Sequence, residues 1–325
     1  MSTRSMPSDK KIPAISLRKR KKGNNLRNST LPLHLMLLAP MLVVFIYSYL
    51  PMFGIVIAFQ KYDFTKGLAA FWQSEWVGLG NFRQMIAMGE PVRIIWNTVR
   101  IAFLKIAIGF FVPIVVALML NEVRLKLFKR SVQTIIYMPH FISWVLLAGI
   151  IKQVISIDGF LNVNILSSLG IKPISFLSSN VFFVPMLVGT DIWKEFGYGT
   201  IVYLAAITNV DPALYEAAVM DGASRWRQTW HITLTGMRPI IVLQMVLRLQ
   251  GVLNAGFDQV FNMYNANVYQ TADIIDTWVY RISFESATPM YDKATAIGLF
   301  KSLVSMVFIL ISYFLAYKVA NYQIF

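Results

Sequence analysis

Long apolar stretches alternate with short polar segments along this chain. A helix of about 20 apolar residues crosses the ~30 Å hydrocarbon layer of a bilayer, because each residue advances the helix by about 1.5 Å. Two stretches carry no formal charge, and four carry one or a few charged residues. The predicted spans are residues 33–59, 94–120, 132–151, 182–207, 240–258 and 294–316. The pattern predicts an all-α integral membrane protein with about six transmembrane helices.

Composition supports the same class. The 325 residues are 56% hydrophobic and 14% charged, whereas a soluble domain carries about a quarter charged residues. The absence of Cys excludes disulfides and thiolate metal sites. The three His lie far apart in the sequence, so no metal site is expected, and His34 and His140 are interpreted as span residues with local hydrogen bonds.

Basic residues are concentrated on one side of the predicted spans. Residues 1–30 contain nine Lys or Arg, and the segments 121–131, 208–239 and the C-terminal tail raise the number on that side to 17 of 30. The positive-inside rule makes this side cytoplasmic, with both termini inside. The net charge of +14 is explained by topology and anionic lipid rather than by nucleic-acid binding, because the basic run 18–22 is followed closely by an apolar span.

The polar island between the fourth and fifth spans has the signals of two short helices and a hinge. Asp211 is a good N-cap, and Pro212 suits the first helical position. Gly222 can adopt a left-handed conformation after the first helix. Ser224 can cap a second helix, on which Trp226 and Trp230 share a face. An ordinary amphipathic interface loop and a docking surface for another protein are both compatible with this pattern.

The order of residues in this island resembles a known motif. Glu216-Ala217-Ala218, three residues, Gly222, nine residues, Ile232, one residue and Leu234 resemble the EAA loop of ABC-importer permeases. The flanking residues 193–198 and 221–223 look like those of the sugar-uptake branch. The resemblance extends over about residues 94–316. One departure is Thr235, where the family usually has Pro, and it leaves the end of the second short helix open.

The resemblance implies a type I (MetI-like) importer permease. In that family the loop, here residues 211–236, is a coupling helix seated in a cleft of an ATPase. We expect Glu216 to lie in the first helical turn, where the helix dipole favours its negative charge. We also expect it to pair with a basic group on the partner. The full set of expected coupling residues is Glu216, Ala217, Ala218, Asp221, Gly222, Trp226 and Trp230.

The implied partners are a second homologous permease subunit, two ATPase subunits, an extracytoplasmic solute-binding protein and membrane lipid. No G-x-x-x-x-G-K-[ST] motif occurs, so this non-catalytic chain is expected to need no cofactor, with ATP and Mg bound by the ATPase subunits. Localisation in the bacterial cytoplasmic (inner) membrane follows. The alternative is a secondary transporter or a membrane scaffold protein without ATP coupling.

The front end of the chain indicates a narrower branch. Residues 49–59 and 76–82 are similar to permeases of the polysaccharide branch, which import complex acidic or pectic oligosaccharides, alginate among them. The expected organisation is a basic tail at 1–30, a first span with an external segment at 31–93, the transporter domain at 94–316 and a tail at 317–325. The aromatic-rich segment 60–93 suits an interfacial belt or a partner surface.

Charges inside the weaker spans give the candidate substrate path. Asp191, Lys194 and Glu195 can neutralise one another, since 191 and 194, and 191 and 195, share a helix face. Arg248 has no acid three or four residues away. It must therefore find a partner on another helix, for which Asp191 and Glu195 are candidates, or face the path of an acidic sugar. The predicted path residues are Arg248, Gln244, Asn254 and Lys194.

Overall fold

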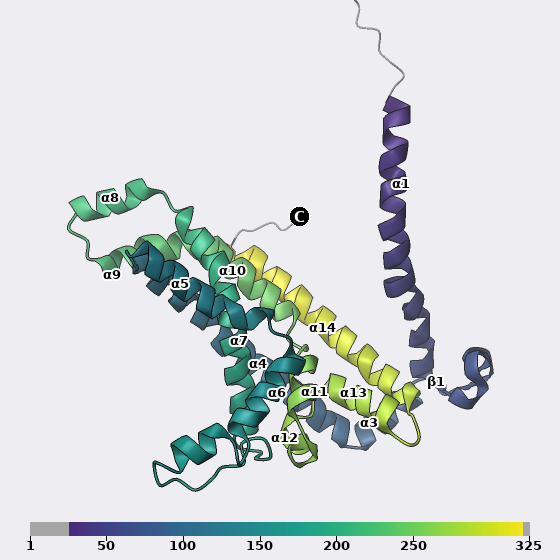
Figure 1. The fold of residues 1–325 in the computed structure, drawn as a ribbon. Coiled ribbons are helices and arrows are strands. Elements are labelled where there is room, and N and C mark those ends of the chain that lie inside the picture. Colours follow the sequence, from purple (N-terminus) through teal and green to yellow (C-terminus); the bar gives the residue numbers. More distant parts are fainter. Residues whose placement is uncertain (1–25, 321–325) are drawn as a thin grey trace, which may run out of the picture. The chain divides into compact units, whose positions relative to one another are not determined.

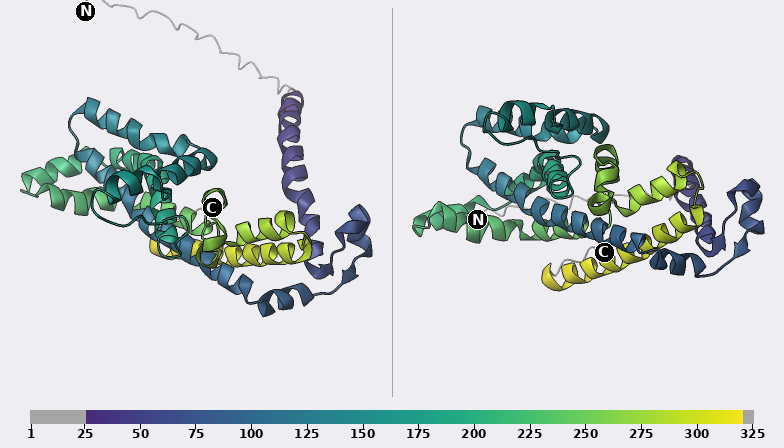
Figure 2. Two further views of the ribbon diagram at one scale, coloured as in Figure 1. Left: turned by 60° about the horizontal axis from the view of Figure 1, so that its bottom comes forward. Right: turned by 90° about the horizontal axis from the view of Figure 1, so that it is seen from below.

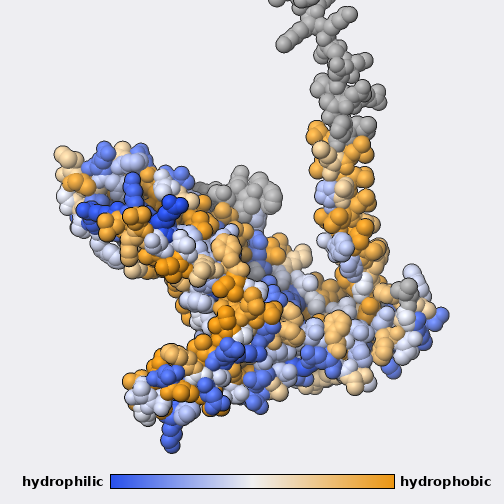
Figure 3. Space-filling model, viewed as in Figure 1, coloured by the Kyte–Doolittle hydropathy of each residue, from blue (hydrophilic) through white to orange (hydrophobic). Residues whose placement is uncertain are grey.

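The computed structural model describes residues 26–320, and the chain divides into two compact units, Met1–Phe53 and Gly54–Phe325. The predicted basic tail therefore lies largely outside the described residues, as does the end of the C-terminal tail. The first predicted span, Leu33–Phe59, is helical throughout and consists of α1 (Leu26–Val44), a π-helical turn η1 (Phe45–Tyr49) and a 3₁₀ segment η2 (Leu50–Phe59). Its apolar side chains are exposed over most of its length, as a lipid-facing helix requires (Figure 3).

The remaining elements are almost all helical (Figure 1). Within residues 26–320 the strands are limited to the antiparallel pair β1 (Gln60–Lys61) and β2 (Glu75–Trp76). The helices that follow up to the bend are η3 (Phe64–Ala69), α2 (Ala70–Gln73), α3 (Gly80–Ala87), α4 (Glu90–Glu122), α5 (Lys126–Tyr137), η4 (Met138–Phe141) and α6 (Trp144–Ile155). The later helices are η5 (Leu161–Leu166), α7 (Phe183–Thr208), α8 (Pro212–Met220), α9 (Arg225–Gln228), η6 (Thr229–Thr233), α10 (Leu234–Gln250), α11 (Phe257–Met263), η7 (Ala266–Val268), α12 (Tyr269–Ala272), α13 (Ile275–Tyr280), η8 (Arg281–Glu285) and α14 (Tyr291–Ala320).

The 33-residue helix α4 and the 26-residue helix α7 pack against each other at the centre of the second unit. One buried cluster, which includes Ile101, Phe183 and Leu187, joins them to α6 and α11. A second cluster around Tyr203 and Met237 joins them to α10. Buried apolar side chains from several helices thus fix the middle of the bundle, while the outer faces remain apolar and exposed.

A third cluster fixes the other side of the unit. It contains Met85 of α3, Ile94 of α4, Ile275 and Trp278 of α13, and Ile297 of α14. The segment leading into α14 folds back so that α13 lies beside it (Figure 2). Figure 1 shows α8 and α9 at one end of this unit and α12 near the other. We call these the α8 end and the α12 end.

Four helices among the described residues are long and apolar enough to cross a membrane: Leu33–Phe59, Glu90–Glu122, Arg225–Gln250 and Tyr291–Phe314. The helix α7 coincides with the predicted span 182–207 and is continuous. Its three charges lower its hydropathy, and it is not among these four. The all-α fold is confirmed.

The predicted span 132–151 is bent rather than formed by one straight helix. Residues 126–141 and 144–155 form two helical segments that are bent by 103°. Ile142 is extended, and the Ser143 hydroxyl accepts a hydrogen bond from the Leu146 N–H at 3.4 Å to begin α6. Pro139, which has no N–H to donate, is the second residue of the turn η4. A charge-free sequence therefore contains a helix end and a new cap, which hydropathy does not detect.

The predicted span 240–258 is also misplaced. The helix begins at Arg225 and ends at Gln250, and residues 251–256 are not helical before α11 begins at Phe257. Gly256 has φ +88°, a left-handed conformation that a residue with a Cβ rarely adopts. The helix therefore ends close to Arg248, inside the apolar stretch that predicts one span.

Candidate functional site

The polar loop predicted to dock a partner folds as its capping residues indicate. The Asp211 carboxylate accepts a hydrogen bond from the Ala213 N–H at 2.9 Å, and Pro212 is the first residue of α8. Gly222 has φ +70°. The Ser224 hydroxyl accepts from the Arg227 N–H at 3.4 Å and caps α9. These predicted cap and hinge positions are confirmed.

Two details of this loop differ from the prediction. The second helix is not short, because α9, η6 and α10 form one helix over Arg225–Gln250. The helix continues through Thr235, where the family usually has Pro, and also through Pro239. Glu216 is not in the first turn of α8, which contains no acidic residue. It lies one turn later, and the helix-dipole argument for it no longer holds.

The loop presents an exposed surface of small, apolar and aromatic side chains. Glu216, Ala217, Asp221 and Gly222 are exposed, and Ala218 is half-buried. The indole rings of Trp226 and Trp230 stack with centroids 6.2 Å apart, and the two side chains are 75% and 57% exposed. The two stacked indoles therefore form an exposed apolar patch on this loop.

Direct contacts connect this surface to the helices beneath it. The hydroxyls of Tyr215 in α8 and Thr233 in η6 are 2.9 Å apart. The Arg225 guanidinium is 3.1 Å from the Glu122 carboxylate at the end of α4. A Cβ on Gly236 would lie only 2.7 Å from Val210, so the two ends of the loop are in close contact. These contacts join the loop to α4 and to the helix that contains η6 and α10.

The first buried polar cluster of the bundle is centred on Lys105, whose residue is 8% exposed. Its Nζ lies 3.1 Å from the Asp191 carboxylate of α7 and donates to the Ala255 carbonyl at 2.8 Å and to Gln259 Oε1. The Gln259 amide in turn donates to the Leu187 carbonyl of α7 at 2.8 Å. One lysine therefore connects α4, α7 and the non-helical segment 251–256.

A second polar cluster lies at the bend between η4 and α6. Lys194 donates to the His140 carbonyl at 2.6 Å and to the Glu195 carboxylate at 3.2 Å. His140 Nδ1 is 2.8 Å from Glu195, and its ring stacks on Tyr198 at 4.0 Å. The local hydrogen bond predicted for His140 is confirmed. The proposed mutual neutralisation is correct for Lys194 and Glu195 and wrong for Asp191, which pairs with Lys105 on another helix.

The environment of Arg248 differs from that of these paired charges. Its guanidinium lies against two helix positions without side chains, because a Cβ on Gly109 of α4 or on Gly199 of α7 would be 3.3 Å or 3.6 Å from it. Among the described residues no carboxylate lies within 4.0 Å of the Arg248 guanidinium. Asp191 pairs with Lys105, and Glu195 pairs with Lys194. Those two acids are therefore not partners of Arg248. Tyr203 of α7 is only 2% exposed, and its hydroxyl has no hydrogen-bond partner within the described part of the chain.

The other predicted path residues separate into two groups. Gln244 is half-buried one turn before Arg248 on α10, and Asn254 is exposed in the segment 251–256. Lys194 is only 6% exposed and is bound to the bend. Its position does not fit a path-lining role. The Lys105–Gln259 contact was not predicted, because 154 residues separate the two partners and the sequence signals it only through an unusual Lys inside a predicted span.

A third buried cluster lies nearer the α12 end. The Asp273 carboxylate, which is fully buried, accepts from Arg281 at 2.6 Å and from Thr277 at 2.7 Å. Burial raises the pKa of Asp273, and the hydrogen bonds from Arg281 and Thr277 oppose that rise. Arg281 also lies 3.5 Å from Glu90 at the start of α4. No group of three or more His, Asp or Glu placed to hold a metal ion occurs among residues that the structure describes.

Comparison with known proteins gives consistent matches. Residues 109–321 match the family described as the binding-protein-dependent transport system inner membrane component. Protein LplB of Bacillus subtilis is 43% identical over 287 residues, which are 88% of each chain. The polygalacturonan/rhamnogalacturonan transport system permease protein YteP of the same organism is 41% identical over 286 residues, with the same coverage of both chains.

Two solved structures match as well. One is the crystal structure of a bacterial ABC transporter involved in the import of the acidic polysaccharide alginate, with a TM-score of 0.82 at 37% identity over 90% of this chain and 97% of the other. The second is the bacterial alginate ABC transporter in complex with an alginate pentasaccharide-bound periplasmic protein, with a TM-score of 0.81 at 36% identity over 91% and 98%. The resemblance drawn from the 211–236 loop and the predicted fold class are both confirmed.

Proposed function

This chain belongs to the binding-protein-dependent transport system inner membrane component family, and we propose that it is the permease subunit of an ATP-driven importer of acidic oligosaccharides. It forms half of the translocation pathway, together with a second homologous permease. The observation that carries the proposal is the exposed surface of the loop 211–236, which we call the α8 surface. Its stacked Trp226 and Trp230 lie at the start of the helix that also contains Arg248.

ATP hydrolysis belongs to two partner subunits, which bind ATP and Mg. Each permease binds one ATPase subunit through its α8 surface, so a pair of permeases binds two. The α8 end then faces the cytoplasm, with both termini on that side, and the α12 end faces an extracytoplasmic solute-binding protein. The basic side chains Arg225 and Arg227 near α8 agree with this orientation.

The acidic substrate class is supported by two independent observations. Relatives at 43% and 41% identity include a permease named for polygalacturonan and rhamnogalacturonan transport, and an alginate importer has the same fold. Within this chain, Arg248 is a guanidinium without an acidic partner among the described residues, next to Gly109 and Gly199. An arginine forms strong, two-point hydrogen bonds with a carboxylate, which a uronic acid supplies.

Coupling is tested at the α8 surface. Glu216→Lys reverses an exposed charge at the proposed contact, and Glu285→Lys reverses an exposed charge outside it as the matched control. We expect the first variant to insert normally but to lose co-purification of the ATPase subunits and substrate-stimulated ATP hydrolysis, and the control to keep both. Uptake that continues without ATP hydrolysis would instead support the secondary-transporter alternative.

The substrate role is tested at Arg248. Arg248→Gln keeps hydrogen-bond donors and removes the charge. We expect uptake of oligogalacturonide to fall roughly tenfold or more, while uptake of the methyl-esterified oligosaccharide and the thermal stability of the complex remain unchanged. Equal loss of both uptake activities together with poor assembly would assign Arg248 a structural role.

A further inference from the structure

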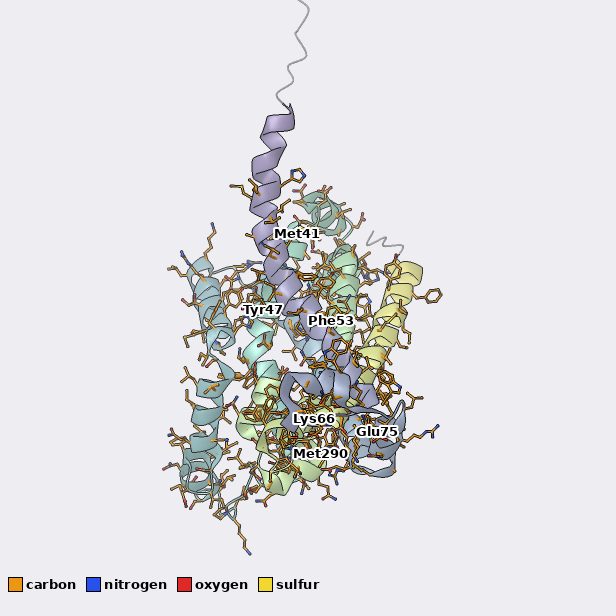
Figure 4. All side chains as sticks on the ribbon, turned by 90° about the vertical axis from the view of Figure 1, so that its right-hand side faces the viewer. Met41, Tyr47, Phe53, Lys66, Glu75 and Met290 are labelled. Carbon is orange, nitrogen blue, oxygen red and sulfur yellow. The ribbon has the colours of Figure 1, made fainter. Side chains whose placement is uncertain are left out.

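A cavity of about 530 Å³ lies at the end of α14 that is distant from α8. One wall is the segment 61–75, which contains the β1–β2 hairpin, and the other is the loop 288–293 that leads into α14. Figure 4 shows Lys66 and Glu75 of the first wall on the same side of the molecule as Met290 of the second. The volume is within the usual range of small-molecule sites.

Buried polar contacts hold the first wall in place. The amide of Asn81, which is 3% exposed, donates to the carbonyls of Ala58 at 3.0 Å and Gln60 at 2.9 Å. The Gln60 side chain donates to the Phe71 carbonyl at 3.1 Å. The base of the hairpin is therefore fixed to α3, and hydrogen bonds hold this wall of the cavity in one conformation.

Aromatic contacts hold the two walls together. The ring of Tyr291, the first residue of α14, meets the ring of Tyr62 edge-on at 6.4 Å and the ring of Phe64 at 6.1 Å. Tyr62 and Phe64 also line the cavity. The site thus has aromatic surfaces on a scaffold that joins two segments about 225 residues apart.

The cavity lining contains three lysines and three acidic residues. Lys66 lies 3.8 Å from Asp63. The ammonium groups of Lys61 and Lys293 have no carboxylate within 4.0 Å in the described part of the chain, although Glu75 is the cross-strand neighbour of Lys61 and Asp292 precedes Lys293. The carboxylates of Glu75 and Asp292 and the polar groups of Gln73 and Ser74 add hydroxyl-binding groups to the same lining.

We propose that this cavity is a binding subsite for a uronate-containing saccharide on the extracytoplasmic face of the permease. Ammonium groups bind the sugar carboxylate, carboxylate and amide groups bind its hydroxyls, and aromatic rings cover its C–H faces. The proposal rests on the proposed function, because an importer of acidic oligosaccharides needs such a ligand at this face. The subsite is separate from Arg248 and receives the saccharide before it reaches the spans.

The test uses the complete transporter, purified with its partner permease and ATPase subunits but without the solute-binding protein. Trigalacturonate is the probe, and its methyl ester is the uncharged comparison. We expect Lys61→Gln/Lys293→Gln to weaken trigalacturonate binding roughly tenfold, to the level that the ester shows with the wild-type complex. Lys172→Gln, which removes an exposed lysine outside the cavity, is the matched control and should bind like wild type.

The outcomes separate this inference from the proposed function. Unchanged binding in the double variant, or no binding of trigalacturonate to the wild-type complex, overturns the subsite even if the complete system imports the sugar. If the variant lowers only the ATPase stimulation by the loaded solute-binding protein, the cavity accommodates a protein loop and the inference is wrong. Failure of the complete wild-type system to import any uronate oligosaccharide overturns the proposed substrate. Single variants Lys61→Gln and Lys293→Gln, each expected to weaken binding by a smaller factor, replace the double variant if it does not assemble.

Discussion

Replacing Lys105 by Met removes the one cation that connects α4, α7 and the segment 251–256. The side chain keeps a similar length but loses its contacts with Asp191 at 3.1 Å, with the Ala255 carbonyl at 2.8 Å and with Gln259. Breaking a buried ion pair by removing one partner costs about 3–5 kcal/mol. The Asp191 side chain is 25% exposed and keeps some hydration, so we expect the lower end of that range, about 3 kcal/mol.

The double variant Lys105→Met/Asp191→Leu separates the cost of the unpaired Asp191 carboxylate from the cost of the lost hydrogen bonds to Ala255 and Gln259. It removes the unpaired carboxylate and leaves the unsatisfied Ala255 and Gln259 oxygens, which cost about 1–3 kcal/mol. The double variant should therefore be more stable than Lys105→Met alone. The assay is the thermal unfolding midpoint of the purified complex, in which a loss of about 3 kcal/mol lowers the midpoint by roughly 6–12 °C. Additive losses in the double variant, or an unchanged midpoint in the single one, would refute the reasoning.

Three further variants test other parts of the structure. Gly222→Val forces a β-branched residue into φ +70° and should cost about 1–3 kcal/mol locally, which substrate-stimulated ATP hydrolysis would report as reduced coupling with normal membrane insertion. Gly197→Ala should lower the unfolding midpoint because its Cβ would overlap the Ile136 carbonyl, whereas Gly189→Ala on the same helix meets no atom within 4 Å and should be tolerated. Arg281→Met leaves the buried Asp273 carboxylate without its 2.6 Å partner and should destabilise by about 3 kcal/mol at neutral pH. Burial already raises the pKa of Asp273, so protonation relieves this loss as the pH falls, and midpoints measured between pH 5 and 8 should show the variant approaching wild type at the acidic end.

Local signals in the sequence were sufficient for the α8 loop. Asp211, Gly222 and Ser224 act on groups within three residues of themselves, so capping rules identify them without knowledge of the fold. The same rules do not predict that α9 continues into α10, because the Thr at position 235 removes a stop signal but does not by itself make the helix continuous.

Tertiary contacts explain the remaining differences. The partner of Asp191 is Lys105, 86 residues away, and helix periodicity can only compare residues on one helix. The 103° bend after α5 lies in a charge-free stretch. Hydropathy is uniformly high there, so it does not mark the end of one helix and the start of the next. For Arg248, the sequence did establish the lack of an acid on its own helix. Its position against Gly109 and Gly199 depends on the packing of α4 and α7, which no local pattern encodes.

The length of the helix from Arg225 to Gln250 has a mechanical consequence. Its 26 residues make a rod of about 39 Å, with Trp226 at one end and Arg248 less than one turn from the other. The hydrogen bonding changes along it, because Thr229–Thr233 form a π-helical turn and Pro239 has no N–H to donate. The helix can therefore bend at these two places, as well as at Gly222 before it and at residues 251–256 after it. In the proposed transporter, a push on the tryptophans would still displace one helix as a whole, and so change where the positive charge of Arg248 stands between α4 and α7.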